Sequence, residues 1–271
     1  MGARMAKITE EDREQFALEA DHYKKTIDES LEKEKNMLTV MKSDSVGVEY
    51  KKLILAEEMI YVATLYIQIN GSSLKILHVK NNDALNDARK ILYKAIIYLE
   101  EIVTNSINIA YSELADKMEA IQNTPVQKRY QLMQKLGLAI QMVIDGFGDN
   151  SKWKWSFVEL QGRFAVVAKN LIDMKTAVKD YFDPNSPNYD ATVLYIRLVR
   201  KLIDDSATAY RDRYELSTRR IDDINAGINF LLASRRIAVA LGSSDDAEEI
   251  KKKAVTWKKL MEADQKAGKS N

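Results

Sequence analysis

The sequence of 271 residues contains no cysteine, only two histidines and three prolines, and ten glycines. The absence of cysteine excludes disulfide bonds, thiolate zinc sites and a cysteine nucleophile. Because proline and glycine often end helices and strands, their scarcity predicts few turns and long helices or strands. Two histidines leave little imidazole for acid–base chemistry or metal binding.

The chain also lacks an excess of charge of one sign. Lysine and arginine number 41 and aspartate and glutamate number 40, so the formal net charge is +1. This balance excludes the strongly basic footprint of a dedicated nucleic-acid binder and the acidic excess of a disordered tail. Hydrophobic residues make up 46% of the chain, which is enough to form a sizeable core.

A secretory signal and a membrane-spanning segment are not expected either. Residues 1–14 contain no apolar core of the kind that a signal peptide needs. The most apolar stretch, Leu53–Ile69, is interrupted by Glu57 and Glu58 and by further polar residues. We therefore expect a cytoplasmic protein without a transmembrane segment.

What is present is a 3–4 spacing of apolar residues, repeated in long blocks and typical of helices. No block alternates as a strand would. The pattern predicts an all-α fold, a bundle of about seven long, mostly antiparallel helices with coiled-coil-like packing. The expected helices cover residues 9–43, 48–69, 84–121, 125–146, 152–181, 191–241 and 245–265.

The sixth of these helices is expected to be continuous over about 50 residues, or about 75 Å. Its seam passes through Tyr210 and Tyr214, which would then pack side by side; a break near Asp204–Ser206 or Gly227 is the alternative. The expected organisation is a flexible N-terminus at 1–8 and a bundle at 9–241 with a sub-boundary at the proline-rich loop 183–190. An amphipathic helix with a frayed tail follows at 242–271.

Motifs that would bind a metal or cofactor are incomplete. Glu19 and His22 have the spacing of a di-iron site, but position 75, three residues before His78, is lysine. The aspartate pairs 204–205 and 222–223 lack a third carboxylate at the correct spacing. The pair 245–246 lies at a helix start, where acidic residues favour the helix dipole. No catalytic residue, metal or cofactor is therefore expected.

These observations favour a non-catalytic scaffold or adaptor that acts through protein–protein contacts, with a second copy of the chain as one candidate partner. A helical enzyme remains an alternative, with a site assembled only in three dimensions. Its pocket would use the polar line of the second helix: Glu57, Tyr61, Thr64 and Gln68. Another alternative is a peripheral binder of nucleic acid or anionic membrane, although nucleic acid is the less expected partner. It would use the basic groups Arg219–Arg220, Arg235–Arg236 and Lys251–Lys253.

Two places are candidates for the interaction. Trp155 and Gly162 lie on one line of a predicted helix, where the glycine would let another helix approach closely. The C-terminal helix has a thin apolar stripe in which Trp257 and Met261 are the largest residues. That helix is predicted to be a detachable element anchored by Trp257, and its flanking cations would meet an acidic surface. These cations are Lys251, Lys252, Lys253, Lys258 and Lys259.

Overall fold

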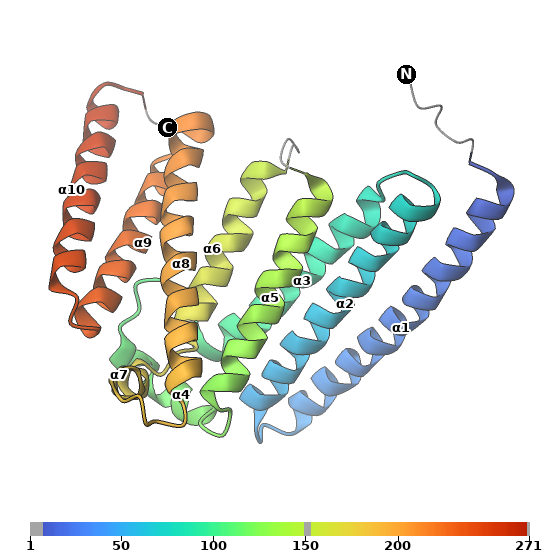
Figure 1. The fold of residues 1–271 in the computed structure, drawn as a ribbon, viewed down its shortest axis with the longest axis horizontal. Helices are drawn as coiled ribbons and strands as arrows, with labels where there is room; N and C mark the ends of the chain where they lie inside the picture. The colour runs from blue at the N-terminus through green and yellow to red at the C-terminus, as the bar shows by residue number, and fades with distance from the viewer. Residues whose placement is uncertain (1–7, 149–152, 270–271) are drawn as a thin grey trace. The chain divides into compact units, whose positions relative to one another are not determined.

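The computed structural model describes residues 8–148 and 153–269. Across these residues the chain forms ten α-helices and no strand, which confirms the all-α prediction (Figure 1). The helices are α1 (Glu10–Ser43), α2 (Val48–Ile76), α3 (Asn82–Val103), α4 (Ala115–Ala120), α5 (Val126–Phe147), α6 (Lys154–Asn170), α7 (Met174–Phe182), α8 (Tyr189–Arg213), α9 (Ile221–Ala240) and α10 (Ser244–Lys266). A 3₁₀ turn, η1 (Tyr111–Leu114), precedes α4, and a π-helical turn, η2 (Tyr214–Thr218), follows α8.

The chain divides into two compact units. Unit 1 comprises Met1–Tyr98 and Lys135–Ser151, and unit 2 comprises Leu99–Gln134 and Lys152–Asn271. The proline-rich loop 183–190 lies within unit 2. The predicted flexible segment 1–8 lies, apart from Ile8, outside the described residues, as do positions 270–271 of the predicted tail.

In unit 1, α1 packs along α2 and begins with a reciprocal cap between Thr9 and Asp12. Its buried face is thin. Near its end Glu34 is 4% exposed and accepts hydrogen bonds from Tyr98 Oη and from Lys94 Nζ of α3. A buried carboxylate is tolerated when such donors replace its hydration, so this cluster fixes α1 onto α3.

Helix α2 forms much of the core of unit 1. It extends to Ile76, beyond the predicted end at residue 69. The buried Asn70 side chain accepts from the Asn81 backbone N–H at 2.9 Å and joins the helix to the segment before α3. Among the described residues, α2 alone is long and apolar enough to cross a membrane by length and composition. However, 61% of its most apolar window is buried, as in the core helix of a soluble protein.

The helix predicted over 84–121 is wrong beyond Val103. Thr104 has a φ of 136°, which ends α3. The Asn170 side chain then donates to the carbonyls of Thr104 and Ser106, at 3.2 and 3.1 Å. These carbonyls therefore bond to α6 rather than to a continuing helix. The helix predicted over 152–181 is also two helices, because Asp173 accepts from the Thr176 N–H and caps a new helix, α7.

A fully buried lysine holds the same irregular segment. Lys169 is 0% exposed, and its Nζ donates to Ile109 O at 3.2 Å and to Asn170 Oδ1 at 2.9 Å. The ammonium also lies 4.9 Å from the centre of the Tyr111 ring. Burial, reinforced by the charge of Arg236, lowers the pKa of Lys169 to about 8.

This pKa predicts a stability that rises with pH. Between pH 8 and the ordinary lysine value of 10.5, the unfolded chain binds more protons than the folded chain, so the free energy of unfolding increases as the pH rises. The gain is on the order of 3 kcal/mol. Urea unfolding at pH 7.5 and 10 would measure it. Buried tyrosines with raised pKa values, such as Tyr111 and Tyr195, lower the stability near pH 10, so the contribution of Lys169 is the difference between the wild type and Lys169→Met. We expect the exposed-site control Lys179→Met to behave as the wild type; an equal change in all three proteins would contradict the prediction.

Candidate interaction site

The segment after α8 reverses the chain, so the predicted continuous helix over 191–241 is wrong. Helix α8 ends in the π-helical turn η2, Arg219 adopts a left-handed conformation with a φ of 53°, and α9 runs back along α8. Tyr210 and Tyr214 therefore have different partners. The Tyr210 ring stacks on Phe230 of α9 at 5.6 Å, whereas Tyr214 is fully buried and donates to Asp264 of α10 at 2.8 Å.

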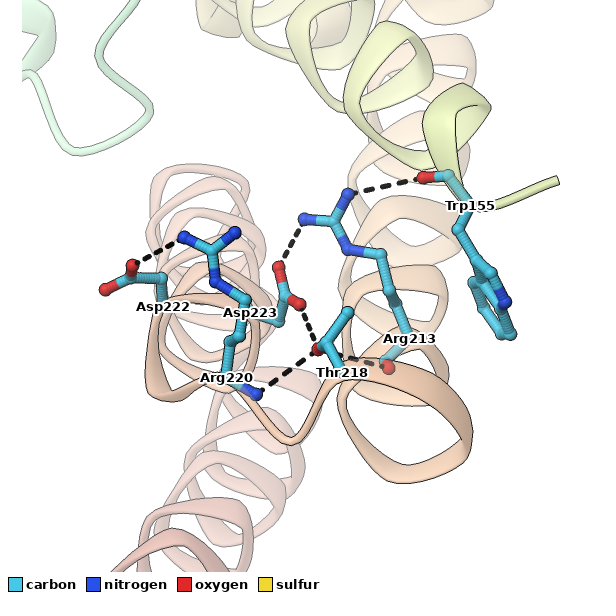
Figure 2. A network of polar contacts seen from close by, with 6 residues as sticks. All are labelled: Trp155, Arg213, Thr218, Arg220, Asp222 and Asp223. Atoms are coloured by element: carbon cyan, nitrogen blue, oxygen red, sulfur yellow. Dashed lines mark hydrogen bonds and ion pairs between the residues drawn. The ribbon is translucent and has the colours of Figure 1, made fainter. Parts of the chain in front are cut away.

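A network of polar side chains closes the reversal (Figure 2). The Asp223 carboxylate, 4% exposed, accepts from Arg213 Nη2 and from Thr218 Oγ1. Arg213 Nη1 also donates to the Trp155 carbonyl of α6 at 3.3 Å, and the Arg220 backbone N–H donates to Thr218 Oγ1 at 3.2 Å. The network thus ties the end of α8, the start of α9 and the start of α6 together.

A shallow pocket of about 440 Å³ opens beside this network. It is lined by Trp155, Glu159, Tyr210, Arg213, Thr218, Arg220, Asp222 and Asp223. Its charged groups are of both signs, and the arginines are paired with aspartates: Arg213 with Asp223, and Arg220 with Asp222 at 3.4 Å. Burial raises the pKa of Tyr210, although Arg213 opposes that shift, so its hydroxyl stays protonated. Chemically, the pocket offers hydrogen-bond donors and paired charges.

Trp155 and Gly162 both contact α8. An ideal Cβ on Gly162 would lie 2.7 Å from Tyr210 Cε2, so the helix that approaches closely is α8 of the same chain. Trp155 is half-buried, and Lys154 Nζ lies 5.1 Å from the centre of its ring. A role of these two residues in binding a partner stays a prediction.

Trp257 docks within its own unit. It is 4% exposed and lies over α9, where an ideal Cβ on Gly227 would come within 3.2 Å of the indole ring. The Arg211 guanidinium and Lys253 Nζ lie 5.2 and 5.0 Å from the ring centre. Met261 is half-buried, whereas Lys251, Lys252 and Lys253 are exposed.

The far end of α10 is held by a buried acid that sequence reasoning missed. Asp264 is 9% exposed and accepts from the Tyr214 hydroxyl, and Arg219 Nη1 lies 3.4 Å from the same carboxylate. Burial, together with the bond to Asp264, raises the pKa of Tyr214. The sequence spacing does contain one signal for this contact. Asp264 follows Trp257 by seven residues, or two helical turns, and therefore lies on the same face of α10.

The remaining candidate residues do not converge. Among the described residues, no three histidine, aspartate or glutamate side chains are placed to hold a metal ion. Glu19 accepts from Ser72 at 2.7 Å, and His22 is exposed. In the polar line of α2, three residues are exposed and Thr64 is half-buried; Glu57 pairs with Lys135 of α5.

The basic pairs are engaged in contacts within unit 2. Arg219 pairs with Asp264, as described above. Arg235 lies 4.0 Å from Glu248 of α10, and Arg236 donates to the Ile107 carbonyl at 3.1 Å. Arg219, Arg235 and Arg236 therefore connect segments of the fold, while Arg219, Arg220 and the lysines of α10 are exposed.

A model of the TP0443 family matches residues 12–265. The chain belongs to the TP0443 family. The match runs from α1 to α10, so the TP0443 region includes the reversal network, Trp257 and Asp264. No curated protein and no solved structure matches the chain.

Proposed function

We propose that the chain is a non-catalytic scaffold or adaptor that binds another protein. The observation that supports this proposal is an exposed apolar patch in unit 1, formed by Ile54 and Tyr61 of α2 and Leu138 and Met142 of α5. Their exposed fractions are 55%, 47%, 66% and 40%. We call these four residues the α2–α5 patch.

One ion pair links α2 and α5 near these four side chains. Glu57 of α2 pairs with Lys135 of α5. Ile54 and Tyr61 lie one turn before and one turn after Glu57, while Leu138 and Met142 lie one and two turns after Lys135. Residues at such spacings share a helix face, so we infer that the four apolar side chains belong to the surface that carries the ion pair.

This composition fits a protein interface better than a catalytic site. Aromatic residues and methionine are enriched in interfaces, and an exposed apolar patch with polar residues among it is typical of a surface that a partner covers. The patch carries one lysine and one glutamate that are already paired with each other. A partner would therefore bury mainly apolar area, at about 25 cal/mol per Å².

The proposal is tested with the double variant Ile54→Ser/Leu138→Ser. The matched control is Leu18→Ser, which removes an apolar side chain that is 75% exposed on α1 of the same unit. Tagged full-length chains would be cross-linked and purified from the native cell, and the recovered proteins identified. Sedimentation velocity of the purified chains would distinguish self-association.

We expect one or more proteins, or a second copy, to be recovered with the wild type and with Leu18→Ser, and to be lost with the double variant. Circular dichroism and thermal melting would show that all three chains are folded. Recovery of the same proteins with all three chains, or of none with the wild type, would contradict the proposed function.

A further inference from the structure

The α2–α5 patch carries almost no charge, although 30% of the residues of the chain are charged. Among the exposed residues between positions 54 and 68 of α2 and between 131 and 142 of α5, the only charged ones are Glu57 and Lys135. Depletion of charge is a property of the core of protein interfaces. We propose that this patch joins two copies of the chain about a two-fold axis that passes between Glu57 and Lys135. The inference rests on the proposed function, because it names the partner of the same patch.

The two charges make the patch complementary to itself. Glu57 and Lys135 are opposite in sign, come from different helices and contact each other. In an interface with two-fold symmetry, every contact between two different residues occurs twice, with the roles of the copies exchanged. An axis between the two residues therefore places the glutamate of each copy opposite the lysine of the other. Two copies thus bring together four charges, each of which has two opposite charges as its nearest neighbours.

The ion pair within one copy does not oppose this arrangement. The side chains of Lys135 and Glu57 are 57% and 55% exposed, so water screens their attraction and they can reorient at little cost. A second copy would remove part of this water, and the attraction between opposite charges strengthens as water is excluded. The four apolar side chains of the patch would be covered at the same time, which supplies the apolar contact that is typical of homodimers.

A second copy is favoured over a different protein because the chain itself meets every requirement of the patch. A different partner has to offer an apolar surface with one anion and one cation at the separation of Glu57 and Lys135, in the reversed order. The α2–α5 patch of a second copy is such a surface once it is turned about the two-fold axis. Dimers with two-fold symmetry are also the commonest soluble oligomers.

Charge reversal tests the two-fold arrangement. Glu57→Lys gives each patch two lysines and Lys135→Glu gives each patch two glutamates, so four like charges would meet in either homodimer. We expect sedimentation velocity of the full-length chains to show a wild-type dimer, and a dimer Kd raised about a hundredfold in each single variant. An equimolar mixture of the two single variants should dimerise again, and so should Glu57→Lys/Lys135→Glu, in which the pair is reversed. The control Lys90→Glu reverses the lysine of an exposed ion pair on α3 of the same unit and should leave the Kd unchanged.

The outcomes separate this inference from the proposed function. All substituted side chains are exposed, so the fold is retained, and circular dichroism of each variant checks this. If the wild type stays monomeric throughout the micromolar range while another protein is recovered from the cell through the α2–α5 patch, the dimer is wrong and the proposed function stands. If the wild type is monomeric and no protein is recovered, both are wrong. Single variants that dimerise like the wild type, or a mixture of them that stays monomeric, would show that two copies do not meet about this axis.

Discussion

Replacing Trp257 by alanine is expected to release α10 from unit 2 while α8 and α9 stay folded. Truncation of a buried tryptophan costs about 3–5 kcal/mol. The other buried residues of α10 are Ala247, Ala254 and Asp264, which contribute little apolar area. Without the indole ring beside Gly227, the remaining contacts of α10 do not offset the conformational-entropy cost of ordering its 23 residues.

Hydrogen exchange measured by mass spectrometry separates this outcome from general unfolding. In Trp257→Ala we expect the amides of 244–266 to lose protection and those of 189–213 to keep it. The control Val255→Ala removes a side chain of the same helix that is 47% exposed and should change neither region. If protection is lost throughout unit 2, α10 is ordinary core and the idea of a detachable element is wrong.

The second large effect is expected at Asp223. Alanine at this position would leave the Arg213 guanidinium, whose side chain is 17% exposed, without its carboxylate, and would leave Thr218 without its acceptor. Removing one partner of a buried ion pair costs about 3–5 kcal/mol. We therefore expect the free energy of unfolding of unit 2 to fall by that amount.

The neighbouring residue provides the matched control. Asp222 pairs with Arg220, but its side chain is 84% exposed, so Asp222→Ala should cost less than about 1 kcal/mol. Urea unfolding of both variants would measure the difference, with the double variant Arg213→Met/Asp223→Leu expected to recover most of the lost stability. Equal unfolding midpoints for Asp222→Ala and Asp223→Ala would show that the network does not hold the reversal.

Most helices could be predicted because their signals are local. The first, second, fourth and last predicted helices correspond to α1, α2, α5 and α10, and the end of α9 near Gly242 is also as expected. The thin stripe of α1 and the continuous apolar surface of α2 follow from the spacing of residues within each helix.

The breaks at Thr104 and Arg219 involve distant residues. Thr104 and Arg219 adopt positive φ values, yet neither is a glycine, so composition gives no warning. The carbonyl of Thr104 is bonded by Asn170, 66 positions away, and Arg219 is held by Asp264, 45 positions away. Helical periodicity carries no information about contacts at that separation.

In the candidate sites, too, local features could be predicted from the sequence and contacts between distant residues could not. Trp257 could be recognised as the main apolar residue of its helix, but Gly227, which makes room for its ring, could not be paired with it. Glu57 and Lys135 are 78 positions apart and each is unremarkable within its own helix. Their ion pair therefore emerges only in the folded structure of unit 1.

The antiparallel packing of α8, α9 and α10 also has a kinetic consequence. Each of these helices contacts the next one along the chain, so only short loops must close before apolar surface is buried. Segments with such low contact order assemble in microseconds to milliseconds. Residues 189–266 can therefore fold early, with the chain reversal at Arg213 and Asp223 as their nucleus. The contacts that Arg236 and Asn170 make with the 104–108 segment would then form later.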